Sequence, residues 1–589
     1  MIYCVALTQI RSIQVQVKEM NKVGWMLMDA SRERFPEPFE ASICAAYVIL
    51  KARERELVDV ADISVFLAEC GTPKRIRSLI CMTIEKAWNL YRPLIASCDV
   101  ESLKEFLTSD VRDLRRYVVS TPYEIQSLTF KLLGLSPSDA FADFGSDIGN
   151  VLINALHDVG VKSALGYEIS QETATLAEMR LDAAGYQKKA AVLRQNVFAV
   201  NPKDATFDKV FCSPPLGMKF MDDCIRTYVT SKAALPELRP SCSSTWIFAL
   251  RALDSLKPTG KGVVIVNDGS LFNQTELSCR KYLMDRNLIE AVISLPTPIF
   301  AGTGIATSIV LLNPSKKDTS VLMVDASQLG RRGKGLVVLS EREIDQIADI
   351  VMSGKQNEGI PYERIEANVV AREEFILHPR RYIKSDVVKL EFPDSKPLKE
   401  LVVSIRRGSS LTPHELSILT APERTPFHYI TQANIKDGII EKDIPSLKSM
   451  PPAKAAYCAK NGDIILTKVG RPIKCAVACL NDGEQLLIGS NQYIITPDER
   501  RIDPFFLKTF FDSAIGQTVL AQISVGVAQP AIALRDLNEI RIPVVPMEKQ
   551  KSIALAYRAR QDEVEILRRK LDRSLSALNG VFEEMIKED

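Results

Sequence analysis

The feature that most limits the fold of this sequence is an alternation of two kinds of segment between residues 120 and 385. Short apolar segments of strand length are separated by longer stretches in which apolar residues recur at helical spacing. Such an alternation is typical of a doubly wound α/β sheet, in which helices cover both faces of largely parallel strands. The segments predicted as strands are DAFADFG, KSALGYEI, KAAVLRQ, FDKVFCS, GKGVVIVN, EAVISLP and SIVLLN.

The pattern of apolar residues changes on both sides of this region. A chain of 589 residues is long enough for several domains, and we predict four parts. Residues 1–115 show helical spacing, residues 116–388 form the α/β domain, and residues 389–547 contain the strand-like runs GDIILTK and NQYIITP of an α+β domain. Residues 548–589 contain few helix breakers and are predicted to form one long helix.

The predicted terminal helix carries its apolar residues on a narrow heptad seam. Such a seam is too narrow for a helix buried in a core, and it favours pairing with a second helix. We therefore expect this helix to dimerise or to dock on a partner. The seam is interrupted by Arg560 and Ser574 and consists of Ile553, Tyr557, Val564, Leu567, Leu571, Leu578, Val581 and Met585.

Composition excludes several classes of protein. Hydrophobic residues make up 46% and charged residues 25%, which is globular composition. The net charge of +2 gives no overall positive field, so any site for a polyanion has to be a local patch. The longest apolar runs are too short for a membrane helix, and we expect no association with a membrane. The N-terminal residues lack the pattern of a signal peptide, so we expect a cytoplasmic protein.

The cysteines give no sign of a disulfide framework or a metal site. The 12 cysteines are scattered without a CxxC pair, and we expect them to be reduced. Cys475 and Cys479 lie closest to a metal-binding spacing, but they belong to a strand-like apolar run with no histidine nearby. We therefore predict that the protein holds no metal.

A glycine-containing loop follows the first predicted strand. Asp143-Phe-Gly145-Ser-Asp147-Ile-Gly149 lies between that strand and an apolar helix, where glycines let the backbone turn tightly and approach a ligand. Glu168 ends the next predicted strand, and a carboxylate at that place suits the two hydroxyls of a ribose. The pattern predicts a cofactor site at the ends of these strands, for either nicotinamide or methyl-donor chemistry.

The sequence after the fourth predicted strand narrows this interpretation. It continues as Ser213-Pro214-Pro215-Leu216, which resembles the [Asp/Asn/Ser]-Pro-Pro-aromatic motif of amino-directed DNA methyltransferases. GKGVVIVNDGSLF, LIEAVISLPTPIFAGTGIATSIVLLN and EEFILHPRRYI are similar to segments of the modification subunit of type I restriction systems, over roughly residues 1–385. The resemblance implies a Rossmann-like core that binds S-adenosylmethionine and transfers its methyl group to adenine N6 in DNA.

The resemblance also implies roles for individual residues. Ser213 and the Pro214 carbonyl would accept hydrogens from the exocyclic amine, and Leu216 stands where the family has an aromatic residue that stacks on the extruded base. Asp147 stands where the family usually has glycine, so its carboxylate would either repel the methionine carboxylate or pair with the methionine amine. The implied cofactor-binding residues are Thr121, Pro122, Asp143, Gly145, Ser146, Asp147, Gly149, Glu168 and Asn196, and the implied catalytic residues are Ser213, Pro214, Pro215 and Leu216.

Two alternatives stay open at this point. Because Asp147 and Leu216 depart from the family pattern, the chain is also consistent with a DNA-binding module that keeps the fold without catalysis and acts as a recognition or regulatory partner. Because Ser213 is more typical of cytosine-N4 enzymes, N4 methylation is a second alternative. An RNA methyltransferase would share the same core but is disfavoured by the C-terminal domain.

Residues from about 395 onward resemble the specificity subunit of the same systems in a single-half form. The segments that carry this resemblance are LKELVVSIRRGSS, GDIILTKVG and SVGVAQPAIALRDLNEIRIPVVPMEKQKSIA. The resemblance implies double-stranded DNA as a partner in a restriction-modification or related defence system, with the terminal helix pairing two copies or binding specificity or restriction subunits. The residues expected to contact DNA phosphates are Arg406, Arg407, Lys468, Arg471 and Lys474.

Overall fold

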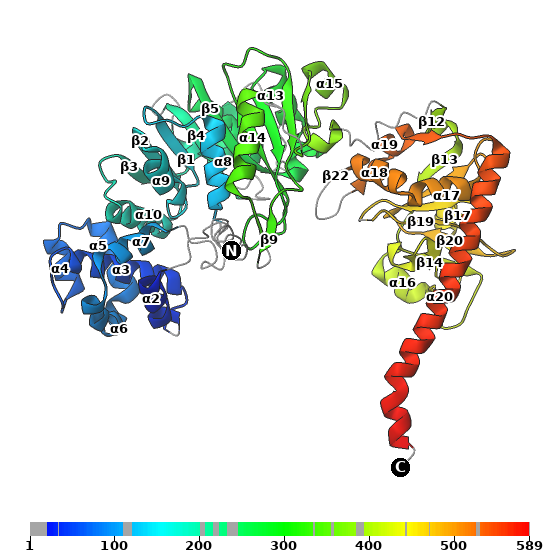
Figure 1. The fold of residues 1–589 in the computed structure, drawn as a ribbon, viewed down its shortest axis with the longest axis horizontal. Helices are drawn as coiled ribbons and strands as arrows, with labels where there is room; N and C mark the ends of the chain where they lie inside the picture. The colour runs from blue at the N-terminus through cyan, green and yellow to red at the C-terminus, as the bar shows by residue number, and fades with distance from the viewer. Residues whose placement is uncertain are drawn as a thin grey trace, which may run out of the picture. The chain divides into compact units, whose positions relative to one another are not determined.

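The chain separates into two compact units, Met1–Ile383 and Lys384–Asp589, which are drawn in Figure 1. The computed structural model describes residues 21–32, 34–109, 120–200, 206–215, 223–231, 245–333, 336–354, 359–383, 394–441, 444–470, 472–525 and 531–587. The predicted boundaries at residues 115 and 388 lie outside the described residues, so they stay predictions.

The first unit is built around a nine-stranded sheet with the order β11-β8-β6-β7-β5-β4-β1-β2-β3. From β3 to β5 all neighbouring strands are parallel, in the doubly wound order 3-2-1-4-5, and β7 runs antiparallel between β5 and β6. The predicted α/β fold is confirmed. The strands are β1 (Ala140–Phe144), β2 (Ser163–Glu168), β3 (Ala190–Arg194), β4 (Phe207–Cys212), β5 (Leu256–Asn267), β6 (Ile289–Ser294), β7 (Thr307–Leu312), β8 (Val321–Asp325) and β11 (Tyr362–Ile365), with a separate hairpin of β9 (Arg331–Gly333) and β10 (Leu336–Val338).

Helices cover both faces of this sheet because each strand sends alternate apolar side chains to opposite sides. On β1, for example, Phe141 joins one core, whereas Ala142 and Phe144 join the other. One face carries α8 (Tyr123–Leu133), α9 (Asn150–Asn154), α10 (Gln171–Ala183) and α14 (Glu341–Ser353), of which α8 and α14 lie side by side (Figure 1). The other face carries α11 (Asp223–Ser231), α12 (Thr245–Asp254) and α13 (Leu277–Asp285), and α15 (Ala367–Arg372) contributes Val370 to the same core.

The described residues that precede the sheet are helical. Their central helix α3 is buried on nearly all sides, and it packs against α2, α5 and α7. The same core includes Leu176 and Met179 of α10, whose Ala174 and Ala177 face the sheet. Helix α10 therefore joins the helical part to the sheet. The helices are α2 (Lys22–Arg32), α3 (Pro38–Arg53), α4 (Ile63–Glu69), α5 (Lys74–Ile84), α6 (Trp88–Tyr91) and α7 (Val100–Thr108).

The described residues of the second unit form an α+β arrangement of several helices and five small sheets. The two larger sheets have the orders β13-β21-β18-β19 and β14-β20-β17, and the three others are the two-stranded pairs β12-β24, β15-β16 and β22-β23. Residues 504–523 form two helices, because the side chain of Ser513 accepts a hydrogen bond from Gly516 N and starts a new helix there. The elements are β12 (Ser395–Pro397), β13 (Val402–Arg407), α16 (Pro413–Leu419), β14 (Phe427–Ile430), β15 (Ile435–Lys436), β16 (Ile439–Ile440), β17 (Cys458–Ala459), β18 (Ile464–Thr467), β19 (Cys475–Val477), β20 (Gln485–Ile488), β21 (Gln492–Pro497), α17 (Pro504–Asp512), α18 (Ala514–Ile523), β22 (Ser524–Val525), β23 (Ala531–Ile532), α19 (Leu534–Glu539) and β24 (Arg541–Pro543).

The second unit ends in one long helix, α20 (Met547–Lys587), as the sequence predicts. Its first turns pack on α17, where the buried Lys508 ammonium donates to Asp512 (2.6 Å) and to the Tyr557 hydroxyl (2.7 Å). Further along, Leu567 and Leu571 of the predicted seam are more than half exposed. The helix is therefore anchored at its start and leaves part of its seam uncovered in this chain.

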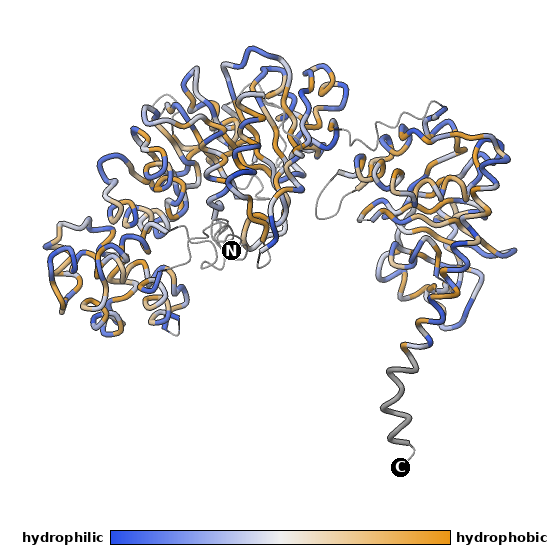
Figure 2. The backbone as a smooth tube through the Cα atoms, in the orientation of Figure 1, coloured by the Kyte–Doolittle hydropathy of each residue, from blue (hydrophilic) through white to orange (hydrophobic). Residues whose placement is uncertain are grey.

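Hydropathy follows the layers of the two units. Figure 2 shows the hydrophobic residues gathered along the strands and the inward sides of the helices. Within the described ranges, no helix is both long enough and apolar enough to cross a membrane. The same ranges contain no group of three or more His, Cys, Asp or Glu side chains placed to hold a metal ion.

Candidate functional site

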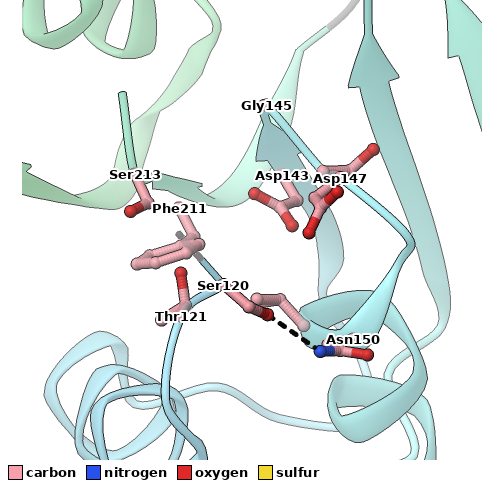
Figure 3. A pocket seen from close by; sticks show the side chains of 10 residues that line it. Ser120, Thr121, Asp143, Gly145, Asp147, Asn150, Phe211 and Ser213 are labelled. Carbon is pink, nitrogen blue, oxygen red and sulfur yellow. Dashed lines mark hydrogen bonds between the residues drawn. The ribbon is translucent and has the colours of Figure 1, made fainter. Parts of the chain in front are cut away.

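A pocket lies at the carboxyl ends of β1 and β4, where the strand order of the sheet reverses (Figure 3). Connections leave opposite faces of a sheet at such a point, and the crevice between them is the usual ligand site of this architecture. The enclosed volume is about 30 Å³, close to that of one water molecule, so a larger ligand would lie mainly outside it, along the strand ends. The lining residues are Ser120, Thr121, Asp143, Gly145, Ser146, Asp147, Asn150, Val151, Phe211 and Ser213.

The loop after β1 owes its shape to three residues in the left-handed backbone region. The φ angles of Gly145, Asp147 and Gly149 are +85°, +47° and +82°. Glycine adopts this region freely, and aspartate is among the few other residues found there. Asp147 thus occupies a backbone position suited to glycine. Gly149 also lets the loop approach α10, because an added Cβ would lie 3.2 Å from the Cβ of Ala177.

Three carboxylates converge on this loop. Asp143 is fully buried, and its pKa lies well above the ordinary value because of burial first, and then because of the charges of Asp147 and Glu168. Figure 3 shows the carboxyl groups of Asp143 and Asp147 close together. Glu168 accepts hydrogen bonds from Asp147 N (3.1 Å) and Ser170 N (2.8 Å), which fixes its side chain at the end of β2.

Two buried polar atoms of the pocket have no hydrogen-bond partner among the described residues, Asp143 Oδ1 and Ser146 Oγ. Buried polar groups are usually paired, so unpaired atoms at a pocket indicate a missing ligand. The carboxyl groups of Asp143, Asp147 and Glu168 disfavour an anionic ligand such as a pyrophosphate. A cation with hydrogen-bond donors would pair with them, so the pocket suits a positively charged ligand.

The far wall of the pocket is tied to the N-terminal helices. Asn150 Nδ2 donates to Ser120 Oγ (3.1 Å), as the dashed line in Figure 3 marks. The buried guanidinium of Arg180, on α10, donates to Asn150 Oδ1 (2.5 Å) and to Ile148 O (2.7 Å). Through its other nitrogens Arg180 also donates to the carbonyl groups of Leu107 and Ser109, both at 2.7 Å, at the carboxyl end of α7. One side chain thus joins the loop to the helical part.

The segment after β4 forms the opposite wall. Ser213 lines the pocket directly after β4, and its carbonyl oxygen lies 3.8 Å from where a Cβ on Gly145 would stand. Pro214 is buried and Pro215 is exposed. Leu216 lies outside the described residues, so its predicted place beside a base stays a prediction. The loops after β1 and β4 therefore face each other across the crevice.

Some of the predicted cofactor-binding and catalytic residues lie together at the pocket. Six predicted residues line it, namely Thr121, Asp143, Gly145, Ser146, Asp147 and Ser213. Glu168 and Gly149 shape the loop from outside, Pro122 precedes α8, and Asn196 accepts a hydrogen bond from Phe198 N (3.0 Å) without lining the pocket. Sequence reasoning missed four lining residues, Ser120, Asn150, Val151 and Phe211. Two of these residues had an available signal. Phe211 lies near the end of a predicted strand, and Asn150 lies at the start of a predicted helix.

The residues predicted to bind DNA phosphates lie in the second unit. Arg406 is partly engaged, since it donates to Ala456 O (2.6 Å) and contacts Asp463. Lys474 Nζ donates to Gln432 O (3.3 Å). The pKa of Lys468 is lowered by burial and by the neighbouring charge of Arg407, and two adjacent cations suit an anion. Arg471 lies outside the described residues. The role of all five stays a prediction.

Known proteins similar to this chain include methylase subunits of type I restriction enzymes, and a family match lies mainly in the first unit. Residues 117–390 match the model of the family described as N-6 DNA Methylase. The type I restriction enzyme MpnII methylase subunit of Mycoplasma pneumoniae is 30% identical over 205 residues, which cover 34% of this chain and 37% of that protein. The HindI methylase subunit of Haemophilus influenzae is 28% identical over 153 residues, or 24% of this chain and 34% of that protein.

This chain spans about a third of the length of those two relatives. A solved structure of the type I restriction-modification system methyltransferase subunit from Streptococcus thermophilus is 16% identical, with a TM-score of 0.47, and the match covers 62% of this chain and 98% of that chain. The family match, by contrast, spans the doubly wound sheet and the crevice at its strand ends. Residues 117–390 thus carry the similarity of this chain to the N-6 DNA Methylase family.

Proposed function

We propose that this chain is a DNA methyltransferase that uses S-adenosylmethionine to methylate adenine N6 at specific sites, within a restriction-modification or related defence system. The observation that carries the proposal is the crevice in which the carboxyl groups of Asp143 and Asp147, at the end of β1 and in the loop that follows, face the Ser213-Pro214 segment after β4. One wall suits a cationic cofactor and the other an exocyclic amine. Such a role would place the protein in the cytoplasm, with the DNA.

The residues present fit this cofactor. S-adenosylmethionine supplies an activated methyl group on a sulfonium and carries a positively charged amine. Asp143, with its unpaired buried oxygen, and Asp147 would pair with that positive charge. The resemblance left open whether Asp147 repels or attracts the methionine end, and its place beside Asp143 in an acidic pocket favours pairing with the amine. Glu168 has its carboxylate fixed by two backbone N–H groups and would accept from the ribose hydroxyls.

The chain would act on the adenine by positioning and polarising its amine. An amine conjugated with a ring is a weak nucleophile, because its lone pair is delocalised. Ser213 Oγ and the Pro214 carbonyl would accept the two amine hydrogens and so concentrate electron density on nitrogen, in line with the methyl group. The nitrogen would then bond to the methyl carbon as the bond from that carbon to sulfur breaks and its electron pair stays on sulfur, and an amine proton would pass to solvent. The target base would have to leave the duplex to reach this crevice.

We further propose that residues 389–547 recognise the DNA site and that α20 pairs two copies or binds a specificity or restriction subunit. Arg407 and Lys468 would contact phosphates, as adjacent cations near the end of β13. The exposed seam residues Val564, Leu567 and Leu571 on α20 are apolar at heptad spacing, which favours helix pairing. Two copies would bring two recognition domains to one site, so a symmetric target is expected.

Modification mapping tests this function. We expect DNA from cells that lack other adenine methylation, and that express this chain, to carry N6-methyladenine in one sequence motif when read by long-read sequencing. Glu168→Ala should lose most of that methylation, because losing the charge-assisted ribose bonds weakens cofactor binding by about 1–3 kcal/mol. N4-methylcytosine in place of N6-methyladenine would refute the assigned base. Unmodified DNA from cells that contain the folded chain would favour the non-catalytic DNA-binding interpretation.

A further inference from the structure

The second unit contains a pocket that none of the residues proposed to contact DNA phosphates lines. It has a volume of about 260 Å³ and lies where β21 begins, beside the β20–β21 turn, the end of β14 and the segment after β13. Its floor is buried and its rim is exposed. The lining residues are Ser410, Tyr429, Thr431, Gln432, Ala433, Gly489, Ser490, Asn491 and Gln492.

Gln492 is the unusual member of this pocket. Its side chain is fully buried, and neither its amide oxygen nor its amide nitrogen has a hydrogen-bond partner in the part of the chain that the structure describes. Its backbone is held firmly, because its N–H donates to Gly489 O (3.1 Å) and its carbonyl accepts from Gly408 N (3.0 Å). The backbone of Gln492 is therefore held in place, and its buried amide has no hydrogen-bond partner among the described residues.

An unpaired buried amide destabilises a fold, so native proteins rarely keep one without a partner. One water molecule occupies about 30 Å³, whereas this pocket has room for a planar ring system. Gly489 helps to keep that room, because a Cβ added there would stand 3.5 Å from both Gln492 Oε1 and Tyr429 Oη. The pocket therefore has the space and the unsatisfied groups of a ligand site.

The chemistry of the amide indicates the class of ligand. It presents a hydrogen-bond acceptor and a donor side by side. These groups complement the exocyclic amine and the ring nitrogen of adenine, and adenine is the base that glutamine pairs with most readily in DNA complexes. Tyr429 adds an aromatic side chain to the floor of the pocket. A base stacked in a duplex could not reach an amide at the floor of a pocket, so the base would have to enter it.

Ammonium groups at the rim suit a ligand attached to phosphates. Lys454 Nζ donates to Ser409 Oγ (2.9 Å) and Ser410 O (3.0 Å) at one side. Lys474 Nζ donates to Gln432 O (3.3 Å) at another. Each ammonium has three donors, so both can contact a phosphate as well. An adenine carried on a nucleic-acid strand therefore fits better than a free base.

We propose that this pocket receives an adenine base turned out of the DNA duplex, distinct from the base that is methylated. The proposal rests on the proposed function for its DNA. Gln492 Oε1 accepts from the exocyclic amine, its Nε2 donates to a ring nitrogen, and the rim lysines hold the flanking phosphates. The second unit would then recognise one base of the DNA site in this pocket, outside the grooves of the duplex.

Substitution of Gln492 tests the role of the amide. Gln492→Leu keeps the volume and removes both hydrogen-bonding groups, and Gln485→Leu is the matched control at an exposed position of β20. We expect Gln492→Leu to bind a duplex with the mapped site about tenfold or more weakly by fluorescence anisotropy, with binding to a scrambled duplex and control affinities unchanged. Its melting temperature should stay the same or rise, because no unpaired amide remains. A lower melting temperature with unchanged specific affinity would make Gln492 structural and overturn the proposal.

A second measurement uses the wild-type chain, so it does not depend on a variant that folds. 2-Aminopurine replaces the neighbour of one adenine of the site at a time, with the methylated adenine left out, and we expect its fluorescence to rise on binding where the adjacent adenine leaves the stack. Free adenosine is titrated in parallel by calorimetry. Binding of adenosine without any 2-aminopurine signal would overturn DNA as the source of the base, and no response in either arm would overturn the pocket altogether. Neither arm needs methyl transfer, so a chain that binds but does not methylate would refute only the proposed function.

Discussion

Asp143 is the residue whose ionisation depends most on what the crevice holds. Burial raises its pKa, and the charges of Asp147 and Glu168 raise it further. The folded state therefore keeps a proton on Asp143 at a pH where the unfolded chain has lost it. The stability of the folded protein consequently falls as the pH rises from the unfolded pKa towards the folded pKa. A bound cation reverses this, because it favours the ionised carboxylate.

We predict that S-adenosylmethionine binds more tightly as the pH rises towards the folded pKa of Asp143, by at most about tenfold per pH unit, and that the affinity levels off above it. Binding should release a proton, which calorimetry in buffers of different ionisation enthalpy measures directly. Asp143→Asn should abolish both the pH dependence and the proton release. Asp147→Asn, which keeps the side-chain shape but removes one charge, should move the window to lower pH. An affinity that stays constant across pH would contradict this account of the pocket.

At the scale of elements, α10 connects the helical part to the sheet through Arg180. Its guanidinium donates to two carbonyl groups at the carboxyl end of α7 and to two groups that flank Gly149, Ile148 O and Asn150 Oδ1. Each bond satisfies an acceptor that burial would otherwise leave unpaired. The loop conformation therefore depends on helices that are distant in the sequence.

We predict that Arg180→Met lowers the free energy of unfolding by about 3–5 kcal/mol, because it leaves several buried acceptors without donors. It should also weaken cofactor binding, since the loop loses its support. Arg75→Met is the comparison variant, because the exposed side chain of Arg75 reaches the same helix through a single ion pair with the largely buried Glu178, and its loss should cost less than that of Arg180. Urea unfolding and cofactor titration measure both effects. Equal losses for the two variants would show that Arg180 has no special role.

The sequence predicted the elements better than the contacts between them. Strand segments and the loop from Asp143 to Gly149 follow from local periodicity and glycine placement, and carboxyl ends of neighbouring parallel strands must meet at one edge of the sheet. Ser120 and Arg180 could not be found in this way. Their places depend on contacts across tens of residues, and Arg180 sits on a helix that is buried on two sides, so its periodicity does not show which face meets the loop.

At the scale of the whole molecule, α20 carries an apolar surface that this chain leaves uncovered. Tyr557 is held by Lys508 and Asp512 of α17, whereas Val564, Leu567 and Leu571 are about half exposed. Exposed apolar residues at heptad spacing are stabilised when a second helix covers them. The second unit therefore has a built-in surface for assembly.

We predict that the wild-type chain self-associates at tens of micromolar, as measured by light scattering, and that Leu567→Glu combined with Leu571→Glu gives a monomer that stays folded. Ile566→Glu is the matched control, since Ile566 is similarly exposed on the same helix but lies off the seam. The control should keep the association of the wild type. A wild type that is monomeric with and without DNA would rule out self-pairing and leave a partner subunit as the occupant of the seam.

Methyl transfer by the purified chain tests the central claim most directly. The chain is incubated with tritiated S-adenosylmethionine and genomic DNA that lacks adenine methylation, and the labelled base is identified after digestion. We expect the label on adenine N6. Ser213→Ala should slow transfer while binding the cofactor normally, because it removes only an acceptor for the amine. A wild-type chain that binds both cofactor and DNA but transfers no methyl group would contradict the claim.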